Sequence, residues 1–256
     1  MTPLLETRSL SKTFGGLKAV QNVDLRIEAN RIVSVIGPNG AGKTTFFNCL
    51  SGIYRPDGGS ILLEGRDITG RPPHQVCQLG LSRTFQNIRL FPEMTVLENV
   101  LVAQFQHRSL SPLPLLLHSP HFCAQEKQSR DDALGFLDFV GLAQYADTLS
   151  SSLAYGLQRR LEIARALATR PRLLLLDEPA AGMNPQETID MVRLISSIRD
   201  RGLAILLIEH DMKVVMTISD DILVLDHGVP IAHGAPDHVR KDPQVIKAYL
   251  GEEISN

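Results

Sequence analysis

Between residues 37 and 45 the chain reads Gly37-Pro38-Asn39-Gly40-Ala41-Gly42-Lys43-Thr44-Thr45. This run matches the phosphate-binding P-loop, G-x-x-x-x-G-K-[ST], whose glycines let backbone N–H groups and a helix N-terminus face an anion. The β-branched, apolar residues 31–36 predict a strand before the loop, and residues 45–50 predict a helix after it. In that arrangement Lys43 reaches the β- and γ-phosphates of a nucleotide and the Thr44 hydroxyl ligates Mg²⁺. A glycine-rich turn that binds nothing is the alternative, and the match of strand, loop and helix argues against it.

Length and composition fit a globular protein with one large domain, or a domain with a subdomain. The chain has 256 residues, of which 43% are hydrophobic and 21% are charged, enough to bury an ordinary core. Its formal net charge is −2, so no overall positive field favours nucleic acid. Cys49, Cys77 and Cys123 are widely spaced and form no CxxC pair. Neither a disulfide framework nor a zinc site is therefore predicted, and the sparse set fits a reducing cytosol.

Signals for secretion or membrane insertion are not found in this sequence. The first ten residues lack an apolar run and include Glu6 and Arg8. No run reaches the roughly 20 apolar residues that span a bilayer. The most apolar tract, residues 110–117, is short and contains two prolines. If the protein serves a membrane, we expect it to act from the aqueous side.

Strand patterns occur at both ends of the chain and a helical texture lies between them. Alternating residues predict strands at 4–8, 23–27 and 60–64, and continuous apolar runs predict strands at 173–177, 204–208 and 221–225. Continuous apolar runs are typical of a parallel sheet that is covered on both faces. Further helices are expected at about 186–200, 211–218 and 243–250.

The central segment, roughly 88–165, is predicted to be a helical subdomain inserted into a single domain of residues 1–256. Thr95 and Glu98 form a capping box at the start of its first helix, and residues 124–140 and 156–169 are helical by spacing. The proline-rich stretch 109–122 cannot be one continuous helix. It is interpreted as a surface loop or, alternatively, as a docking element.

Two adjacent acids close one of the buried strands. Asp177 and Glu178 follow the apolar run 173–176 and precede a proline. An Asp at the carboxyl end of a strand beside a P-loop can bind the Mg²⁺ of a nucleotide, directly or through water. The Glu one position further can act as general base toward an attacking water. Alone, such a pair is more often a solvated strand end; together with the P-loop it predicts a nucleotide site.

Several further motifs resemble those of ATP-binding-cassette (ABC) ATPases. Leu153-Ala154-Tyr155-Gly156-Leu157-Gln158-Arg159-Arg160-Leu161 resembles the signature sequence of that family, and it lies between the helical insert and the Asp-Glu strand. The other matches are Phe14 to the aromatic that stacks on adenine, Gln86 to the glutamine that links Mg²⁺ and water to the helical subdomain, residues 181–184 to the loop across which two cassettes communicate, and His210 to the switch histidine that contacts the γ-phosphate. These landmarks occur in the family's order and cover essentially the whole chain.

The resemblance implies an α/β fold, the P-loop NTPase cassette with a RecA-like parallel core, an antiparallel β-subdomain and an inserted helical subdomain. It implies that ATP is bound by Phe14, the P-loop residues 37–45 and Asp177, and by the signature residues Leu153, Ala154, Tyr155 and Gly156 of a second cassette. Glu178, His210 and Gln86 would be the catalytic residues, and Thr44, Gln86 and Asp177 the residues around Mg²⁺.

The same resemblance implies partners and a location. The second ABC ATPase subunit would be a related but different chain, giving a heterodimer that drives two integral-membrane permease subunits. A solute-binding protein would supply the permeases, and no nucleic acid would be bound. The chain would then be a peripheral protein at the cytoplasmic face of the plasma (inner) membrane.

Details of the motifs are most similar to the importer ATPases for branched-chain amino acids. The similarity lies in residues 36–45, 83–86, 153–156, 177–185 and 208–212, and in the closing run Ala248-Tyr249-Leu250-Gly251. That group also includes urea and amide importers and is close to a lipopolysaccharide-export ATPase, so these remain alternatives. The chain departs from the general cassette pattern at Ala154 (often Ser), Leu157 (usually Gln) and Asn184 (usually Asp). Nothing in the sequence explains Leu157.

Two other classes of P-loop protein fit less well. Cassette ATPases of DNA repair or of ribosomes usually carry tandem cassettes, coiled-coil arms or zinc inserts, none of which is visible here. A GTPase would have an NKxD guanine-binding motif, which is absent. The signature and His210 also argue against a kinase.

Overall fold

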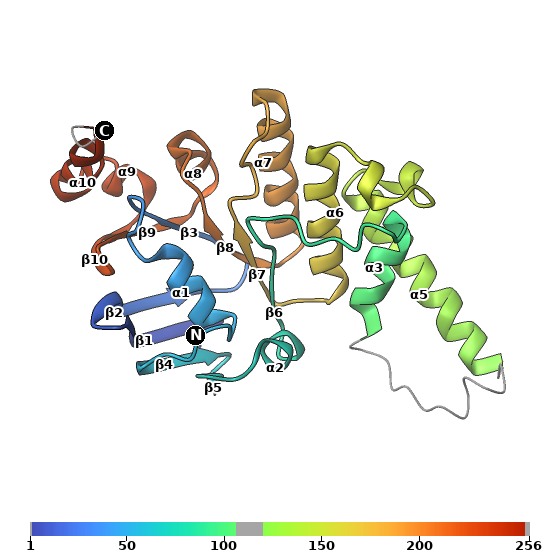
Figure 1. The fold of residues 1–256 in the computed structure, drawn as a ribbon, viewed down its shortest axis with the longest axis horizontal. Coiled ribbons are helices and arrows are strands. Elements are labelled where there is room, and N and C mark those ends of the chain that lie inside the picture. The colour runs from blue at the N-terminus through green and yellow to red at the C-terminus, as the bar shows by residue number, and fades with distance from the viewer. Residues whose placement is uncertain (1, 106–119, 254–256) are drawn as a thin grey trace.

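The computed structural model describes residues 2–105 and 120–253, which form two sheets surrounded by helices (Figure 1). The proline-rich stretch predicted to be a loop or a docking element lies outside the described residues from 109 to 119, and only its last residues enter a helix. In the described part of the chain, no helix is both long and apolar enough to cross a bilayer.

The larger sheet has six strands in the order β10-β9-β3-β8-β7-β6. Its strands are β3 (Ile32–Ile36), β6 (Leu81–Arg83), β7 (Leu173–Asp177), β8 (Ala204–Ile208), β9 (Asp221–Asp226) and β10 (Val229–Gly234). All neighbours pair in parallel except β10, which is antiparallel to β9. Every residue of β3, β7 and β8 is buried, which confirms the parallel core expected from the continuous apolar runs.

The smaller sheet is antiparallel and has the order β2-β1-β4-β5. Its strands are β1 (Leu5–Phe14), β2 (Leu17–Ile27), β4 (Gly58–Leu63) and β5 (Arg66–Asp67). The first two strands are longer than the sequence predicts. They continue up to a two-residue turn, Gly15-Gly16, where Phe14 pairs directly with Leu17. This sheet is the expected antiparallel β-layer of the cassette.

Helix α1 (Lys43–Leu50) lies between the two sheets (Figure 1). Its residues Phe46, Phe47 and Leu50 are buried in one apolar cluster that also contains strand residues from both sheets. The helix begins two residues earlier than predicted, directly after Gly42. The P-loop is therefore held between two layers of the fold.

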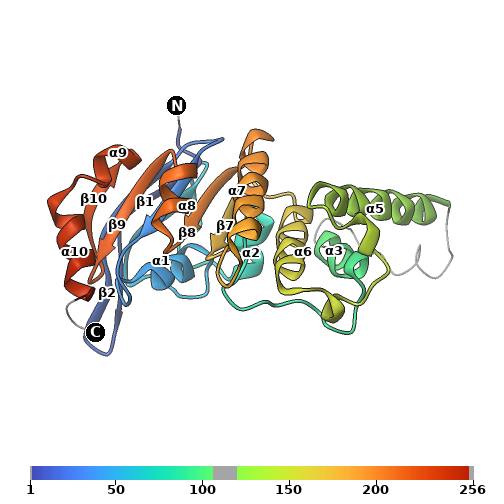
Figure 2. The ribbon, with the colours of Figure 1, turned by 90° about the horizontal axis from the view of Figure 1, so that it is seen from above.

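Three helices gather at one end of the molecule, α3 (Val96–Gln104), α5 (Pro120–Phe139) and α6 (Tyr155–Ala168) (Figure 2). The capping box of Thr95 and Glu98 at the start of α3 is confirmed. Leu161 of α6 and Leu174 of β7 belong to the same apolar cluster, so α6 connects this helical layer to the large sheet. The remaining helices are α2 (Pro73–Gln78), α7 (Pro185–Asp200), α8 (Met212–Ile218), α9 (Pro236–Val239) and α10 (Pro243–Glu253).

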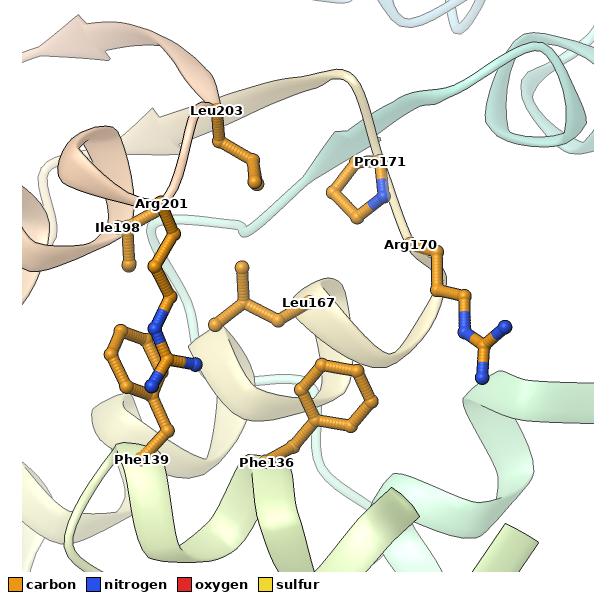
Figure 3. A pocket seen from close by; sticks show the side chains of 8 residues that line it. All are labelled: Phe136, Phe139, Leu167, Arg170, Pro171, Ile198, Arg201 and Leu203. Carbon is orange, nitrogen blue, oxygen red and sulfur yellow. The ribbon is translucent and has the colours of Figure 1, made fainter. Parts of the chain in front are cut away.

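A cavity of about 240 Å³ is lined by residues of α5 and of the ends of α6 and α7 (Figure 3). Its lining consists mainly of apolar side chains: Phe136, Phe139, Leu167, Arg170, Pro171, Ile198, Arg201 and Leu203. The Arg201 guanidinium lies 3.6 Å from the centroid of the Phe139 ring, a cation–π contact between α5 and the end of α7. None of these residues belongs to the predicted nucleotide site. Because they come from α5 and from the ends of α6 and α7, the cavity lies where the helical layer meets the core.

Candidate functional site

The P-loop joins β3 to α1 and can be built only with glycine at two positions. A Cβ on Gly37 would lie 2.0 Å from the carbonyl oxygen of Leu225, and one on Gly42 would lie 2.2 Å from that of Ala19. Gly42 also has φ 98° as the N-cap of α1, a conformation that favours glycine. At Gly40, by contrast, no heavy atom of the described chain lies within 4 Å of the position a Cβ would take. The loop is therefore fixed against the fold on one side and open on the other.

Lys43 closes this loop in the structure. Its Nζ donates hydrogen bonds to the carbonyl oxygens of Gly37 at 2.5 Å and Pro38 at 2.7 Å. Thr44 is exposed and Thr45 is half-buried in the same first turn of α1. An ammonium group, two hydroxyl groups and the N–H groups of the first helical turn thus share one end of the helix, the arrangement that binds phosphate.

Sheet register brings the other predicted residues to the same edge. Ile208 of β8 lies opposite Val35 of β3 on one side and Asp177 of β7 on the other. The residues that follow these strands are the P-loop, His210 and Glu178. Because the strands are parallel, their carboxyl ends lie at one edge of the sheet, where α/β proteins bind ligands.

Glu178 is the centre of a small polar group at this edge. Gln86 Nε2 donates a hydrogen bond of 2.9 Å to Glu178 Oε2, and His210 Nδ1 lies 3.9 Å from the same oxygen. The backbone φ of Glu178 is 48°, a left-handed conformation that costs a non-glycine residue free energy and is found preferentially at functional sites. The structure therefore brings together the three residues predicted to be catalytic.

Asp177 is paired with a residue that the sequence analysis did not assign. Arg83 Nη2 lies 2.7 Å from Asp177 Oδ2, and both side chains are only 5% exposed. Glu209 was also missed: it is buried, and its Oε1 accepts a hydrogen bond of 3.0 Å from the Ala180 N–H. Burial raises the pKa of the Glu209 carboxyl. No periodic pattern marks either residue, because both act through contacts between distant segments.

A third residue without a predicted role, Arg159, connects Gln86 to the signature. Its guanidinium donates to the carbonyl oxygens of Phe85, at 2.6 Å, and of Gln86. The same group donates to Tyr155 Oη at 2.9 Å and to Glu162 Oε2 at 3.2 Å. Arg159 is buried, so this side chain ties the segment around Gln86 to the first turn of α6.

The signature residues lie at the start of α6. Ala154 is the N-cap, Leu153 is buried, and Tyr155 is exposed. A Cβ on Gly156 would lie 3.0 Å from Glu187 Oε1. Gln158 Nε2 donates a hydrogen bond of 3.0 Å to the carbonyl oxygen of Leu153, and the Arg159 guanidinium donates to Tyr155 Oη. Through Arg159, the start of α6 is thus tied to the segment around Gln86.

Packing contacts describe two more positions that the sequence analysis singled out, Phe14 and Leu157. The Phe14 ring, at the tip of β1, is exposed and makes an edge-to-face contact with Tyr54 at 5.2 Å between centroids, as an aromatic platform would require. Leu157 is partly buried against the apolar cluster that α3, α5 and α6 share. Its side chain therefore contributes to helix packing, which accounts for a leucine at this position.

The polar groups at this edge suit a nucleotide better than a cation alone. Within residues 2–105 and 120–253, no three His, Cys, Asp or Glu side chains lie close enough to hold a metal ion. The predicted site residues offer oxygen atoms as metal ligands, and oxygen ligands suit Mg²⁺. These residues are Thr44, Asp177, Gln86 and Glu178. Mg²⁺ in such sites usually takes its remaining ligands from water and from substrate phosphates.

Comparison with sequence families gives two matches. Residues 20–181 match the family described as ABC transporter, and residues 229–255 match the one described as branched-chain amino acid ATP-binding cassette transporter.

Curated relatives match over nearly their full length. The chain is 53% identical over 251 residues to the high-affinity branched-chain amino acid transport ATP-binding protein BraF of Pseudomonas aeruginosa, covering 98% of both chains. It is 52% identical, with the same coverage, to the protein LivG of Escherichia coli strain K12, which has the same description. The lipopolysaccharide export system ATP-binding protein LptB of Haemophilus influenzae is 34% identical, again over 98% of each chain.

Solved structures agree with the sequence relatives. A nucleotide-free ATP-binding cassette from an ABC transporter superposes with a TM-score of 0.84 at 32% identity, covering 96% of this chain and 98% of that one. An ATP-binding cassette in its ADP conformation gives 0.84 at 31% identity, covering 98% and 100%. The fold class predicted from the motifs is confirmed. The chain belongs to the family of ABC transporter ATP-binding proteins.

Proposed function

We propose that this chain is the ATP-hydrolysing subunit of an ABC importer that takes up branched-chain amino acids. The substrate is assigned from the difference in sequence identity between two groups of relatives. Proteins named for branched-chain amino acid transport reach 53% and 52%, whereas the lipopolysaccharide-export protein reaches 34% over the same length. The match of residues 229–255 supports the same substrate. Uptake of urea, amides or other amino acids and lipopolysaccharide export are the alternatives.

The residues at the sheet edge divide the work of hydrolysis. Lys43 and the N–H groups of the P-loop bind the phosphates, and the exposed Phe14 ring stacks on the adenine. Glu178 accepts the proton of the attacking water, and the hydrogen bond from Gln86 keeps its carboxylate in place. His210 lies 3.9 Å from that carboxylate, and we assign it to the γ-phosphate.

Thr44, Asp177 and Gln86 are the residues that we assign to Mg²⁺. When bound, this ion neutralises the charge that develops on the transferred phosphoryl group. Thr44 is an exposed residue in the first turn of α1, and Asp177 is the last residue of β7.

We assign the signature to the ATP of a second cassette, most simply a related ATPase in a heterodimer. Ala154 and Tyr155 are exposed at the start of α6, where a second chain could contact them. In this arrangement the part between about 88 and 165 acts as the helical subdomain. The dimer would work at the cytoplasmic face of the plasma (inner) membrane with two permease subunits and a solute-binding protein.

Uptake measurements test the substrate. In cells that lack this gene, uptake of labelled leucine, isoleucine and valine at micromolar concentration is expected to fall, while uptake of urea is unchanged. Wild-type protein should restore uptake, and the variant Glu178→Gln should not, since transport needs hydrolysis. Normal uptake of all three amino acids in the deletion strain, with other routes for them removed, would contradict the assignment.

A second measurement tests the contact with the permease. The Phe91 side chain is 44% exposed, although its backbone is fixed by hydrogen bonds to the buried Asn99 and to Ser150. Such an anchored, exposed aromatic residue suits a groove that receives a short permease helix, and Leu90 and Met94 lie on either side of it in the sequence. We expect cysteines at these three positions to crosslink to cytoplasmic loops of the permease.

The matched control is Ile246→Cys on α10, because Ile246 is 46% exposed and lies far from Phe91 in sequence. Cys77 and Cys123 are replaced by serine. Cys49 can stay, since burial raises its pKa to about 11 and leaves it protonated. Equal crosslinking of residue 246, or none at positions 90, 91 and 94 in an active complex, would remove this surface from consideration.

A further inference from the structure

The carboxylate of Asp177 lies in a poorly solvated place for a negative charge. It ends the central strand β7, and its side chain is 5% exposed. A buried carboxylate without a partner costs several kcal/mol, so a cation or a proton has to accompany it. Nucleotide and its metal ion bind and leave in each turnover, so Asp177 needs a positive charge that stays when they have left.

Arg83 supplies that positive charge. It stands on β6, the parallel neighbour of β7, and its Nη2 reaches Asp177 Oδ2 at 2.7 Å. The contact takes up one oxygen of the carboxylate. Since both side chains are 5% exposed, solvent screens the pair little.

The guanidinium is fixed from several sides. Its Nη1 donates to Asn48 Oδ1 at 2.7 Å and to Ser51 Oγ at 3.0 Å. Asn48 lies in α1, the helix that begins at the P-loop, and Ser51 is the C-cap of that helix. The rings of Phe47 and Phe85 lie 5.6 and 5.1 Å from it. Arg83 Nε is buried and has no hydrogen-bond partner within the described ranges. A side chain held in this way stays beside Asp177.

The charge balance at the site follows from this pair. Arg83 cancels the charge of Asp177, and the described residues contain no group of three or more ligating side chains that could hold a cation by themselves. Without nucleotide, a divalent cation would find one carboxylate there, that of Asp177. One oxygen of this carboxylate already bonds to Arg83, whose positive charge repels the cation. When ATP is present, its phosphates supply the missing negative charge and further oxygen ligands.

We propose that Arg83 is a resident counter-charge for Asp177, which makes the binding of a divalent cation by this chain dependent on nucleotide. This inference rests on the function proposed above, in which Asp177 is a residue around Mg²⁺. Arg83 is a positioning residue here, which acts through its ion pair with Asp177. A purely structural ion pair between β6 and β7 would give no such dependence.

The test is binding of Mn²⁺ to the full-length chain without nucleotide, measured by electron paramagnetic resonance. Wild-type protein is expected to bind Mn²⁺ weakly, and Arg83→Gln to bind it at least about tenfold more tightly, because a positive charge a few ångströms from the ion is removed. Adding Asp177→Asn to Arg83→Gln should abolish the gain. Arg89→Gln is the matched control, since Arg89 stacks on the same Phe85 ring at 4.2 Å but has no ion pair with Asp177.

A second variant covers the case in which Arg83→Gln does not fold. Asn48→Asp keeps the shape of the side chain and places a carboxylate against Arg83 Nη1, so that one arginine faces two acids. Nucleotide-free Mn²⁺ binding should then rise as it does in Arg83→Gln, again only while Asp177 is present.

Three results would overturn the inference: no gain in the altered chains, an equal gain in Arg89→Gln, or a gain that survives Asp177→Asn. The proposed function has its own arm, the binding of Mn²⁺ together with ATP. If Asp177→Asn leaves that binding unchanged, the assignment of Asp177 to the metal is wrong, and the inference about Arg83 is wrong with it. If only the nucleotide-free measurements fail, Arg83 is a structural residue and the function stands.

Discussion

Replacing Glu178 with glutamine is expected to lower ATP hydrolysis by about 10²–10⁴-fold, the usual contribution of a general base, while ATP still binds. The amide cannot take a proton from water. It can still accept the hydrogen bond that Gln86 Nε2 gives to Glu178 Oε2 at 2.9 Å, so the geometry of the site is kept. Phosphate release in the assembled transporter measures the rate, and a fluorescent ATP analogue measures binding. Because bound ATP is no longer consumed, we also expect a closed dimer to accumulate in sedimentation experiments.

Glu209→Gln provides the matched control for this prediction. It makes the same chemical change in a neighbouring acid, which accepts a hydrogen bond from the Ala180 N–H and lies 3.7 Å from His210 Nδ1. Burial raises the pKa of the Glu209 carboxyl. The amide oxygen of a glutamine can accept the same hydrogen bond from the Ala180 N–H, so the substitution should change the rate little. A wild-type rate in Glu178→Gln, or an equal loss in Glu209→Gln, would show that Glu178 is not the base.

The sequence predicted those parts of the site that depend on local pattern. The P-loop can be recognised because one short segment contains the glycines, the lysine and the hydroxyl groups, between a strand and a helix. Asp177 and Glu178 were predicted as site residues because they directly follow an apolar run. Short elements such as β6, with three residues, and β5, with two, were missed because periodicity needs a longer window.

The contacts that organise the site were not predictable in the same way. Arg83 and Asp177 are 94 residues apart, and Arg159 and Phe85 are 74 apart. Whether such side chains meet depends on strand order and register, which a single sequence does not reveal. Once β6 is placed beside β7, both the ion pair of Asp177 and the position of Gln86 follow from the fold.

The parallel register also explains why one edge of the sheet contains every residue assigned to hydrolysis. Val35, Ile208 and Asp177 lie across from one another, so the loops after β3, β8 and β7 start at the same level. The P-loop, His210 and Glu178 follow these strands at one edge of the sheet for that reason. Their separation in sequence is bridged by the sheet and not by any local motif.

Replacing Lys43 with alanine is expected to act on ATP binding itself, unlike the change at Glu178. In the structure Nζ donates to the carbonyl oxygens of Gly37 and Pro38, and phosphate oxygens offer it stronger, charge-assisted hydrogen bonds. A hydrogen bond to a charged group contributes about 1.5–3 kcal/mol, so the dissociation constant for ATP should rise by roughly ten- to a hundredfold or more. Titration with a fluorescent ATP analogue in the presence of Mg²⁺ gives this value directly.

The control for Lys43→Ala is Lys213→Ala, which removes the same charge from an exposed position in α8. It should leave ATP affinity unchanged if the effect at Lys43 comes from direct contact and not from net charge. Thermal unfolding of both variants shows whether the loop still folds, because Lys43 also closes the P-loop through two carbonyl oxygens. Wild-type affinity in a folded Lys43→Ala chain would mean that the backbone N–H groups of the loop and helix α1 hold the phosphates without the lysine. Weakened binding together with the intact binding of Glu178→Gln would separate the two roles, phosphate binding at the start of α1 and proton transfer at the end of β7.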